Sequence, residues 1–149
     1  MIQFIRTTAS HSDFIKLVHL LDADLKIRDG KDHDFYHQFN SIEQLEYVLI
    51  TYLENEAIGC AALKKHDTAI FEIKRMYVLE KQRGKGIASK LLIQLETWSK
   101  ELGIYKCVLE TGINQPEAIG LYRKNAYIQI DNYHPYEGIP HSLCFEKQL

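Results

Sequence analysis

The chain has 149 residues, of which 46% are hydrophobic and 26% charged, with a formal net charge of -2 and an isoelectric point near 6.4. This length and composition are typical of a single globular domain, here residues 1–149, with a core of its own. The slightly acidic balance argues against a nucleic-acid partner, because nucleic-acid-binding proteins usually carry a basic face.

The N-terminal third predicts a strand, a helix and a polar segment. Residues 1–7 read as a short strand. Ser10 or Ser12 is the candidate cap of a helix, whose apolar residues fall at helical intervals: Phe14, Leu17, Val18, Leu21 and Leu25. From Asp22 to Asn40 we expect irregular, polar structure, followed by a short helical or strand-like run over residues 41–45.

The middle of the chain predicts a hairpin and a further strand. Tyr47–Leu53 and Ala57–Leu63 are apolar runs separated by Glu54-Asn55-Glu56, which favours a hairpin. We expect residues 64–67 to turn the chain into a strand over residues 69–78.

A glycine-rich turn connects that strand to a helix. The turn is Arg83-Gly84-Lys85-Gly86-Ile87-Ala88, and the apolar residues of the helix are spaced by 3.6 residues: Leu91, Leu92, Leu95, Trp98 and Leu102. Such a turn aims unpaired backbone N–H groups and the positive end of the helix outward, which suits a phosphate or pyrophosphate. It is neither a Walker loop nor a dinucleotide fingerprint, because it lacks the Gly-Lys-Ser/Thr and the third glycine of those motifs.

The C-terminal third alternates strands and helices. Gly103 ends the helix, Tyr105–Glu110 predicts a buried strand, and Pro116 suits the first turn of the next helix. Residues 127–130 and 143–145 predict the last strands. Hairpins followed by strand–helix–strand–helix–strand indicate an α+β fold with a mixed, mostly antiparallel central sheet and helices on both faces.

The glycine-rich turn resembles the acyl-CoA pyrophosphate loop of the GNAT family of N-acetyltransferases, Arg/Gln-x-x-Gly-x-Gly/Ala. Glu72–Val78 is similar to the fourth strand of that family. Ala118–Tyr122, followed by Ala126-Tyr127, is similar to its last helix and next strand. The resemblance covers roughly residues 56–131, and the N-terminal third carries no recognisable motif.

The resemblance implies a site for acetyl-CoA as co-substrate, with no metal. The amides of the loop would wrap the pyrophosphate, and the splayed fourth strand would pair with the pantetheine amides. The implied cofactor-binding residues are Met76, Tyr77, Val78, Arg83, Gly84, Lys85, Gly86, Ile87, Ala88, Ser89, Gln115 and Tyr122.

Two side chains are candidate catalytic groups. The acceptor must react as a neutral amine, and an alkylammonium has an ordinary pKa of about 10.4, so a carboxylate near the thioester can act as base. Glu72 holds that position in the resemblance; alternatively, it is an exposed strand residue or forms a salt bridge beside Lys74 and Arg75. Tyr122 corresponds to the acid that protonates the departing thiolate; alternatively, it is a core tyrosine.

The chain departs from the family pattern at two positions. Gln115 stands where the family usually has Asn, and Ala126 stands where a glycine usually precedes the strand aromatic. Glutamine can make similar amide hydrogen bonds with a longer arm. Alanine suggests a less tight backbone but leaves the chemistry alone.

The remaining features are less specific. Cys60, Cys107 and Cys144 lie far apart without CxxC spacing, so we expect buried thiols in a reducing compartment, with a catalytic thiol as the alternative. The pair His33 and His37 has helical metal-ligand spacing but no matching ligand set.

Two segments bear on the acceptor. Five aspartates (Asp22, Asp24, Asp29, Asp32 and Asp34) indicate a solvated loop, or a cleft border that favours a cationic amine. The aromatic cluster Tyr127, Tyr133 and Tyr136, with His134 and Pro135, either covers the acceptor site or packs the sheet edge.

The resulting hypothesis is a cytoplasmic N-acetyltransferase acting on an amine of a small molecule or peptide, with no membrane partner. No apolar run reaches about 18 residues and no signal-peptide pattern occurs. The alternative is a non-catalytic acyl-CoA-binding sensor; a nucleotide-binding protein is disfavoured. Whether the chain forms a homodimer stays open.

Overall fold

A computed structural model describes residues 1–30, 42 and 45–149 of the chain. Its elements in chain order are β1 (Ile2–Thr7), α1 (Ser12–Asp29), β2 (Tyr47–Leu53), β3 (Glu56–Asp67), β4 (Ile70–Val78), η2 (Glu80–Gln82), α3 (Ile87–Glu101), β5 (Lys106–Gly112), α4 (Pro116–Lys124), β6 (Ile128–Ile130) and β7 (Ser142–Gln148). The His33–His37 pair, Asp32, Asp34 and most of the run over residues 41–45 lie outside the described residues.

The strands form one seven-stranded sheet in the order β1-β2-β3-β4-β5-β7-β6. Every neighbouring pair is antiparallel except β4 and β5, which are parallel. Helix α3 lies in the connection from β4 to β5, as a parallel pair needs a crossover connection. The predicted α+β fold with a mixed, mostly antiparallel sheet is confirmed.

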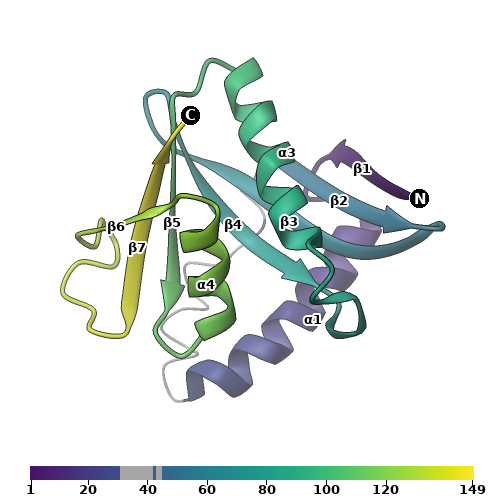
Figure 1. Cartoon of the computed structure of the whole chain (residues 1–149), viewed down its shortest axis with the longest axis horizontal. Helices are drawn as coiled ribbons and strands as arrows, with labels where there is room; N and C mark the ends of the chain where they lie inside the picture. Colours follow the sequence, from purple (N-terminus) through teal and green to yellow (C-terminus); the bar gives the residue numbers. More distant parts are fainter. Residues whose placement is uncertain (31–41, 43–44) are drawn as a thin grey trace.

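The helices cover both faces of the sheet (Figure 1). The larger core joins α3 and Tyr122 of α4 to the sheet residues Leu49, Ile58, Leu63, Phe71 and Ile73, all at most 5% exposed. A second core joins α1 through Phe14, Leu17 and Val18 to Val48, Ile50, Cys60 and Ala62. Neighbours along β2 and β3 thus belong to different cores, as expected where successive side chains point to opposite faces.

The parallel pair separates after three residues. Ile70, Phe71 and Glu72 face Lys106, Cys107 and Val108, and no further pairing of β4 with β5 follows. In Figure 1 the two strands diverge toward the lower part of the view, and helix α4 lies in front of the opening between them. Among the strands that the structure describes, β5 is the neighbour of β4 on that side, and its pairing with β4 ends at Glu72.

Three details of the expected element boundaries are wrong. Helix α1 continues to Asp29, where Gly30 caps it, because Lys26 and Arg28 in its last turn suit the negative end of a helix. The cap at its start is His11, whose Nδ1 accepts from the amide of Asp13 at 3.1 Å. Residues 64–67 extend strand β3, and the turn falls at Thr68 and Ala69.

The predicted hairpin between β2 and β3 is confirmed. Glu54 and Asn55 both have positive φ values, 49° and 70°. A two-residue turn with φ > 0 at both positions matches the twist of the strands that it joins. Leu53 and Glu56 are the first facing pair of the register.

All three cysteines are buried, as expected. Burial raises the pKa of Cys60 to about 12. Burial is also the largest cause that raises the pKa of Cys107 and of Cys144 to about 11. A raised pKa keeps a thiol protonated at neutral pH, and the thiolate is the nucleophile. We therefore expect no reaction with an aromatic disulfide reagent at pH 8 in the folded protein and three thiols titrated in denaturant; one rapidly reacting thiol in the folded protein would contradict the buried assignment.

Candidate functional site

The glycine-rich turn lies at the opening between β4 and β5. Strand β4 ends at Val78, η2 follows, and Gly84 and Gly86 both adopt φ of 79° before α3 begins. Gly86 is the N-cap of α3 and supplies no side-chain cap, so the first amides of the helix keep their donors for another partner. A Cβ atom built on Gly84 or Gly86 would meet nothing within 4 Å. The turn is an open backbone cradle with a positive helix end.

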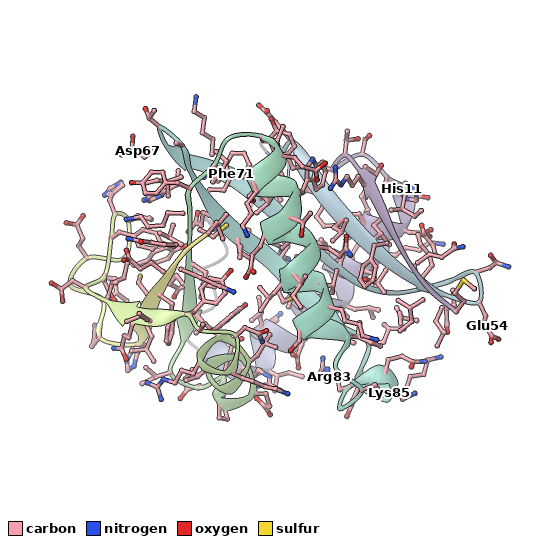
Figure 2. The ribbon with its side chains drawn as sticks, turned by 45° about the horizontal axis from the view of Figure 1, so that its top comes forward. His11, Glu54, Asp67, Phe71, Arg83 and Lys85 are labelled. Atoms are coloured by element: carbon pink, nitrogen blue, oxygen red, sulfur yellow. The ribbon has the colours of Figure 1, made fainter. Side chains whose placement is uncertain are left out.

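A cleft runs from this turn between α3 and α4. Ten of the twelve predicted cofactor-binding residues line it: Met76, Tyr77, Val78, Arg83, Gly84, Gly86, Ile87, Ala88, Ser89 and Gln115. Lys85 and Tyr122 do not. Lys85 is exposed and its Nζ donates to Oε1 of Gln82 at 2.9 Å. Figure 2 shows Arg83 and Lys85 on the connection that precedes α3, far from Phe71 and Asp67.

Arg83 is held in place beside the cleft. Its Nε donates to the carbonyl oxygen of Val78 at 2.9 Å, and its guanidinium lies 5.4 Å from the centre of the Tyr77 ring. Fixing the guanidinium through one N–H leaves other donors of the same group available to an anion.

The cleft also contains charged residues that the motif did not indicate. Arg28 near the end of α1 contacts Glu117 in the first turn of α4 at 2.8 Å and Asp24 at 3.3 Å. Lys124 lines the cleft from the last turn of α4. These residues lie outside the motif positions, and only their place along the same cleft relates them to the turn.

A second cavity adjoins the cleft where β4 and β5 separate. It shares five lining residues with the cleft: Leu21, Met76, Gln115, Ala118 and Leu121. Its polar side chains include Glu72 and Lys74 from β4, Glu110 from β5, and Tyr122 and Tyr136. Both predicted catalytic residues therefore lie in one cavity, and this cavity adjoins the cleft that holds most of the predicted cofactor residues.

A bulge reshapes β4 beside the cavity. The register passes from Lys74↔Ala62 to Tyr77↔Cys60, so Arg75 and Met76 together oppose one residue, and Arg75 has φ of 57°. The Arg75 guanidinium is buried and pairs with Asp22 of α1. The alternative of a Glu72–Arg75 pair is therefore not what the structure has, and Asp22 belongs to a helix rather than to a solvated loop.

Glu72 is 6% exposed and engaged through both carboxylate oxygens. The hydroxyl of Tyr133 donates to its Oε2 at 2.7 Å, and Nζ of Lys74 lies 3.8 Å from its Oε1. The contact with Lys74 is the structural role that the sequence left as an alternative. It also holds the carboxylate in one orientation inside the cavity.

Lys74 is buried in the middle of this group. Its Nζ lies 3.3 Å from the hydroxyl of Tyr136 and 6.0 Å from the centre of that ring. Burial lowers the pKa of Lys74 below its ordinary value, against the opposing effect of the Glu72 and Glu110 carboxylates. The tyrosines of the C-terminal aromatic cluster therefore have different partners. Tyr133 contacts Glu72 and Tyr136 contacts Lys74, both on β4. The hydroxyl of Tyr127 instead donates to Glu96 of α3 at 2.9 Å.

Tyr122 is 6% exposed and packs edge-on against Tyr127 with ring centres 5.9 Å apart. Burial is the main cause that raises its pKa above the ordinary value of 10, and the Glu110 carboxylate adds to it. The phenol is therefore a neutral O–H donor at neutral pH.

The two departures from the family pattern have clear positions. Gln115 is the N-cap residue of α4 and lines both the cleft and the cavity. Ala126 has φ of 72°, in the left-handed region that glycine adopts without a steric cost. This backbone explains why a glycine is usual there, and here alanine accepts the strain.

Neither a membrane-spanning helix nor a metal cluster occurs in the part of the chain that the structure describes. Over those residues no helix is long and apolar enough to cross a bilayer. The same residues contain no group of three or more His, Cys, Asp or Glu side chains arranged to hold a metal ion.

Comparison with known proteins relates the chain to acetyltransferases. Residues 14–127 match the model of the acetyltransferase (GNAT) family. An IAA acetyltransferase of Azospirillum brasilense is 33% identical over 102 residues, 68% of this chain and 67% of that protein. The uncharacterized N-acetyltransferase YjgM of Escherichia coli K12 is 36% identical over 88 residues, 57% of this chain and about half (52%) of that protein.

Solved structures share the fold over the whole chain. A Klebsiella pneumoniae protein provisionally assigned as an acyl-CoA N-acyltransferase matches with a TM-score of 0.84 and 29% identity, covering 100% of this chain and 98% of the other. A GNAT family acetyltransferase of Elizabethkingia anophelis, solved with acetyl-CoA bound, matches with a TM-score of 0.73 and 22% identity, covering 99% and 98%. The family match also reaches into the N-terminal third, where the sequence showed no motif.

Proposed function

The chain belongs to the GNAT family of acetyltransferases and is an acetyl-CoA-dependent N-acetyltransferase, and we propose that it transfers the acetyl group to a primary amine of a small molecule or peptide by direct attack. The observation that carries the proposal is that the cleft at the glycine-rich turn and the cavity at the splayed strands adjoin each other and share five lining residues. The cleft suits the phosphates and pantetheine of the donor, and the cavity suits an acceptor amine beside the thioester.

Binding of the donor is assigned to backbone and fixed cations. The amides of residues 84–89 and the positive end of α3 would hold the pyrophosphate, with Arg83 beside it. The unpaired edge of β4 at Met76 and Val78 would pair with the pantetheine amides. A protein of the same fold was solved with acetyl-CoA bound, which supports acetyl-CoA as the ligand of this fold.

The chemical step uses two groups of the cavity. Glu72 would take a proton from the acceptor ammonium, directly or through water, and the neutral amine would attack the thioester carbonyl. A backbone N–H of Val78 or its neighbour would stabilise the oxyanion of the tetrahedral intermediate. Tyr122 would protonate the CoA thiolate as the C–S bond breaks.

A thiol-release assay tests the proposal. Acetyl-CoA and the protein are incubated with a panel of primary amines, such as polyamines, amino acids, arylamines and lysine peptides, and free CoA is measured with a thiol reagent. We expect acceptor-dependent release for one class of amine. Binding of acetyl-CoA without release for any amine would instead indicate the non-catalytic sensor, for which the turn is needed and Glu72 and Tyr122 are not.

Tyr122→Phe is expected to lower kcat by about 10²-fold, toward the lower end of the effect of a positioned proton donor. The affinity for acetyl-CoA should stay nearly constant, because the thiolate that needs the proton exists only late in the reaction. The measurement is kcat together with the dissociation constant of acetyl-CoA. Tyr127→Phe is the matched control, since it removes the hydroxyl of a buried neighbour that bonds to Glu96. Equal kcat in the Tyr122 variant and the parent would make Tyr122 a packing residue.

A further inference from the structure

The cavity that adjoins the cleft contains a primary amine of the protein itself. Lys74 lines it together with Tyr122 and Met76, and Met76 also lines the cleft assigned to acetyl-CoA. The side chain of Lys74 is 8% exposed, so this amine faces the cavity rather than bulk solvent. Residues 72–76 of β4 all line this cavity. Strand β5 pairs with β4 only up to Glu72, so no β4–β5 pairing separates Lys74 from the cleft.

The surroundings of Lys74 are those that an acceptor amine needs. Glu72 lies 3.8 Å from Nζ and can take a proton from the ammonium. Burial lowers the pKa of Lys74 and thus raises the fraction of neutral amine at a given pH. Tyr122 in the same cavity is a neutral O–H donor for a leaving thiolate. The catalytic groups proposed for an external amine, Glu72 and Tyr122, thus line the same cavity as the amine of Lys74.

We propose that Lys74 is a site of self-acetylation, at which the enzyme transfers the acetyl group of acetyl-CoA to its own Nζ when no acceptor fills the cavity. The neutral Nζ attacks the thioester carbonyl, the C–N bond forms, and the C–S bond breaks. The proton lost by nitrogen goes through Glu72 to solvent. The thiolate takes a proton from Tyr122, which regains one from solvent, giving acetyl-lysine and free CoA. The inference rests on the proposed function of the same site.

Acetylation would change the site in a defined way. The amide carries no charge, so Glu72 would lose the cation beside Oε1 and keep the hydrogen bond from Tyr133. The added acetyl group would also occupy part of the cavity assigned to the acceptor. Self-acetylation would therefore compete with turnover of an external amine.

The test is mass spectrometry of the whole folded chain after incubation with acetyl-CoA and no acceptor. We expect one acetyl group per chain, mapped to the peptide that contains Lys74, with exposed Lys65 and Lys90 modified far more slowly. Lys74→Arg should remove the adduct, whereas the matched Lys65→Arg should keep it. In Tyr122→Phe the rate of modification should fall by about 10²-fold, the same loss as for an external amine.

Two results would overturn the inference. One is an unmodified Lys74 in a protein that binds acetyl-CoA and turns over an external amine, which leaves the proposed function intact. The other is modification of Lys74 at the same rate in the parent, in Tyr122→Phe and in urea-unfolded chain, which indicates reaction without catalysis. Failure of acetyl-CoA to bind at all would instead contradict the proposed function itself.

Discussion

Gly86→Leu is expected to abolish the rise in melting temperature that acetyl-CoA gives to the parent protein. A ligand at 100 times its dissociation constant stabilises the native state by about 2.7 kcal/mol, or roughly 5–10 °C for a domain of this size. Gly86 caps α3 in the wall of the cleft, and the space next to its Cα is open. A leucine side chain would fill the path assigned to the phosphates. The measurement is a thermal melt with and without acetyl-CoA.

The chain offers a matched control for the strain of this substitution. Gly103 follows the other end of α3 with φ of 81°, against 79° for Gly86, and a Cβ there also meets nothing within 4 Å. A leucine costs about 1–2 kcal/mol in the left-handed conformation at either position. Both variants should therefore melt earlier than the parent, but Gly103→Leu should keep the full shift with acetyl-CoA. A full shift in Gly86→Leu would make the assignment of the turn to the phosphates wrong.

Glu72→Gln is expected to lower kcat at neutral pH by about 10²- to 10⁴-fold, the usual contribution of a positioned base. Glutamine has nearly the same shape and still accepts the hydrogen bond from Tyr133. The thermal shift with acetyl-CoA should therefore persist. Raising the pH should partly restore the rate, because an acceptor with a pKa of about 10.4 becomes neutral without help from the enzyme.

The contact between Glu72 and Lys74 requires a control for charge. Glu110→Gln removes a second carboxylate from the same cavity, and a base at Glu72 predicts a much smaller loss for that variant. The measurement is the pH–rate profile of each protein with the acceptor found in the amine panel. Parental rate and parental pH dependence in Glu72→Gln would show that another group or water deprotonates the amine. Equal losses in both variants would indicate that the charge of the cavity, and not a base, is what matters.

The order of the elements could be predicted because it depends on local patterns. Periodic apolar residues gave the helices and strands, and Gly103 and Pro116 marked helix ends through their own backbone preferences. The expected element boundaries that were wrong lie where local sequence signals compete. Residues 22–29 are mostly polar, yet they remain helical. The preceding residue Leu21 is buried, and Asp22 and Arg28 form ion pairs with other elements. Propensity gives way to tertiary contacts in such segments.

The sequence by itself determined the strand, glycine-rich turn and helix, since backbone freedom at Gly84 and Gly86 and the end of a helix are properties of a short segment. The sequence also indicated Glu72 and Tyr122 as candidate catalytic residues, through their place in the motifs. Only the tertiary structure decided which partners these residues have. Tyr133 is 61 residues from Glu72 in the chain, and the pairs Asp22–Arg75 and Arg28–Glu117 join segments 53 and 89 residues apart. Such contacts depend on how the sheet opens after three pairs of β4 and β5, which no short segment specifies because it results from the packing of all the elements around it.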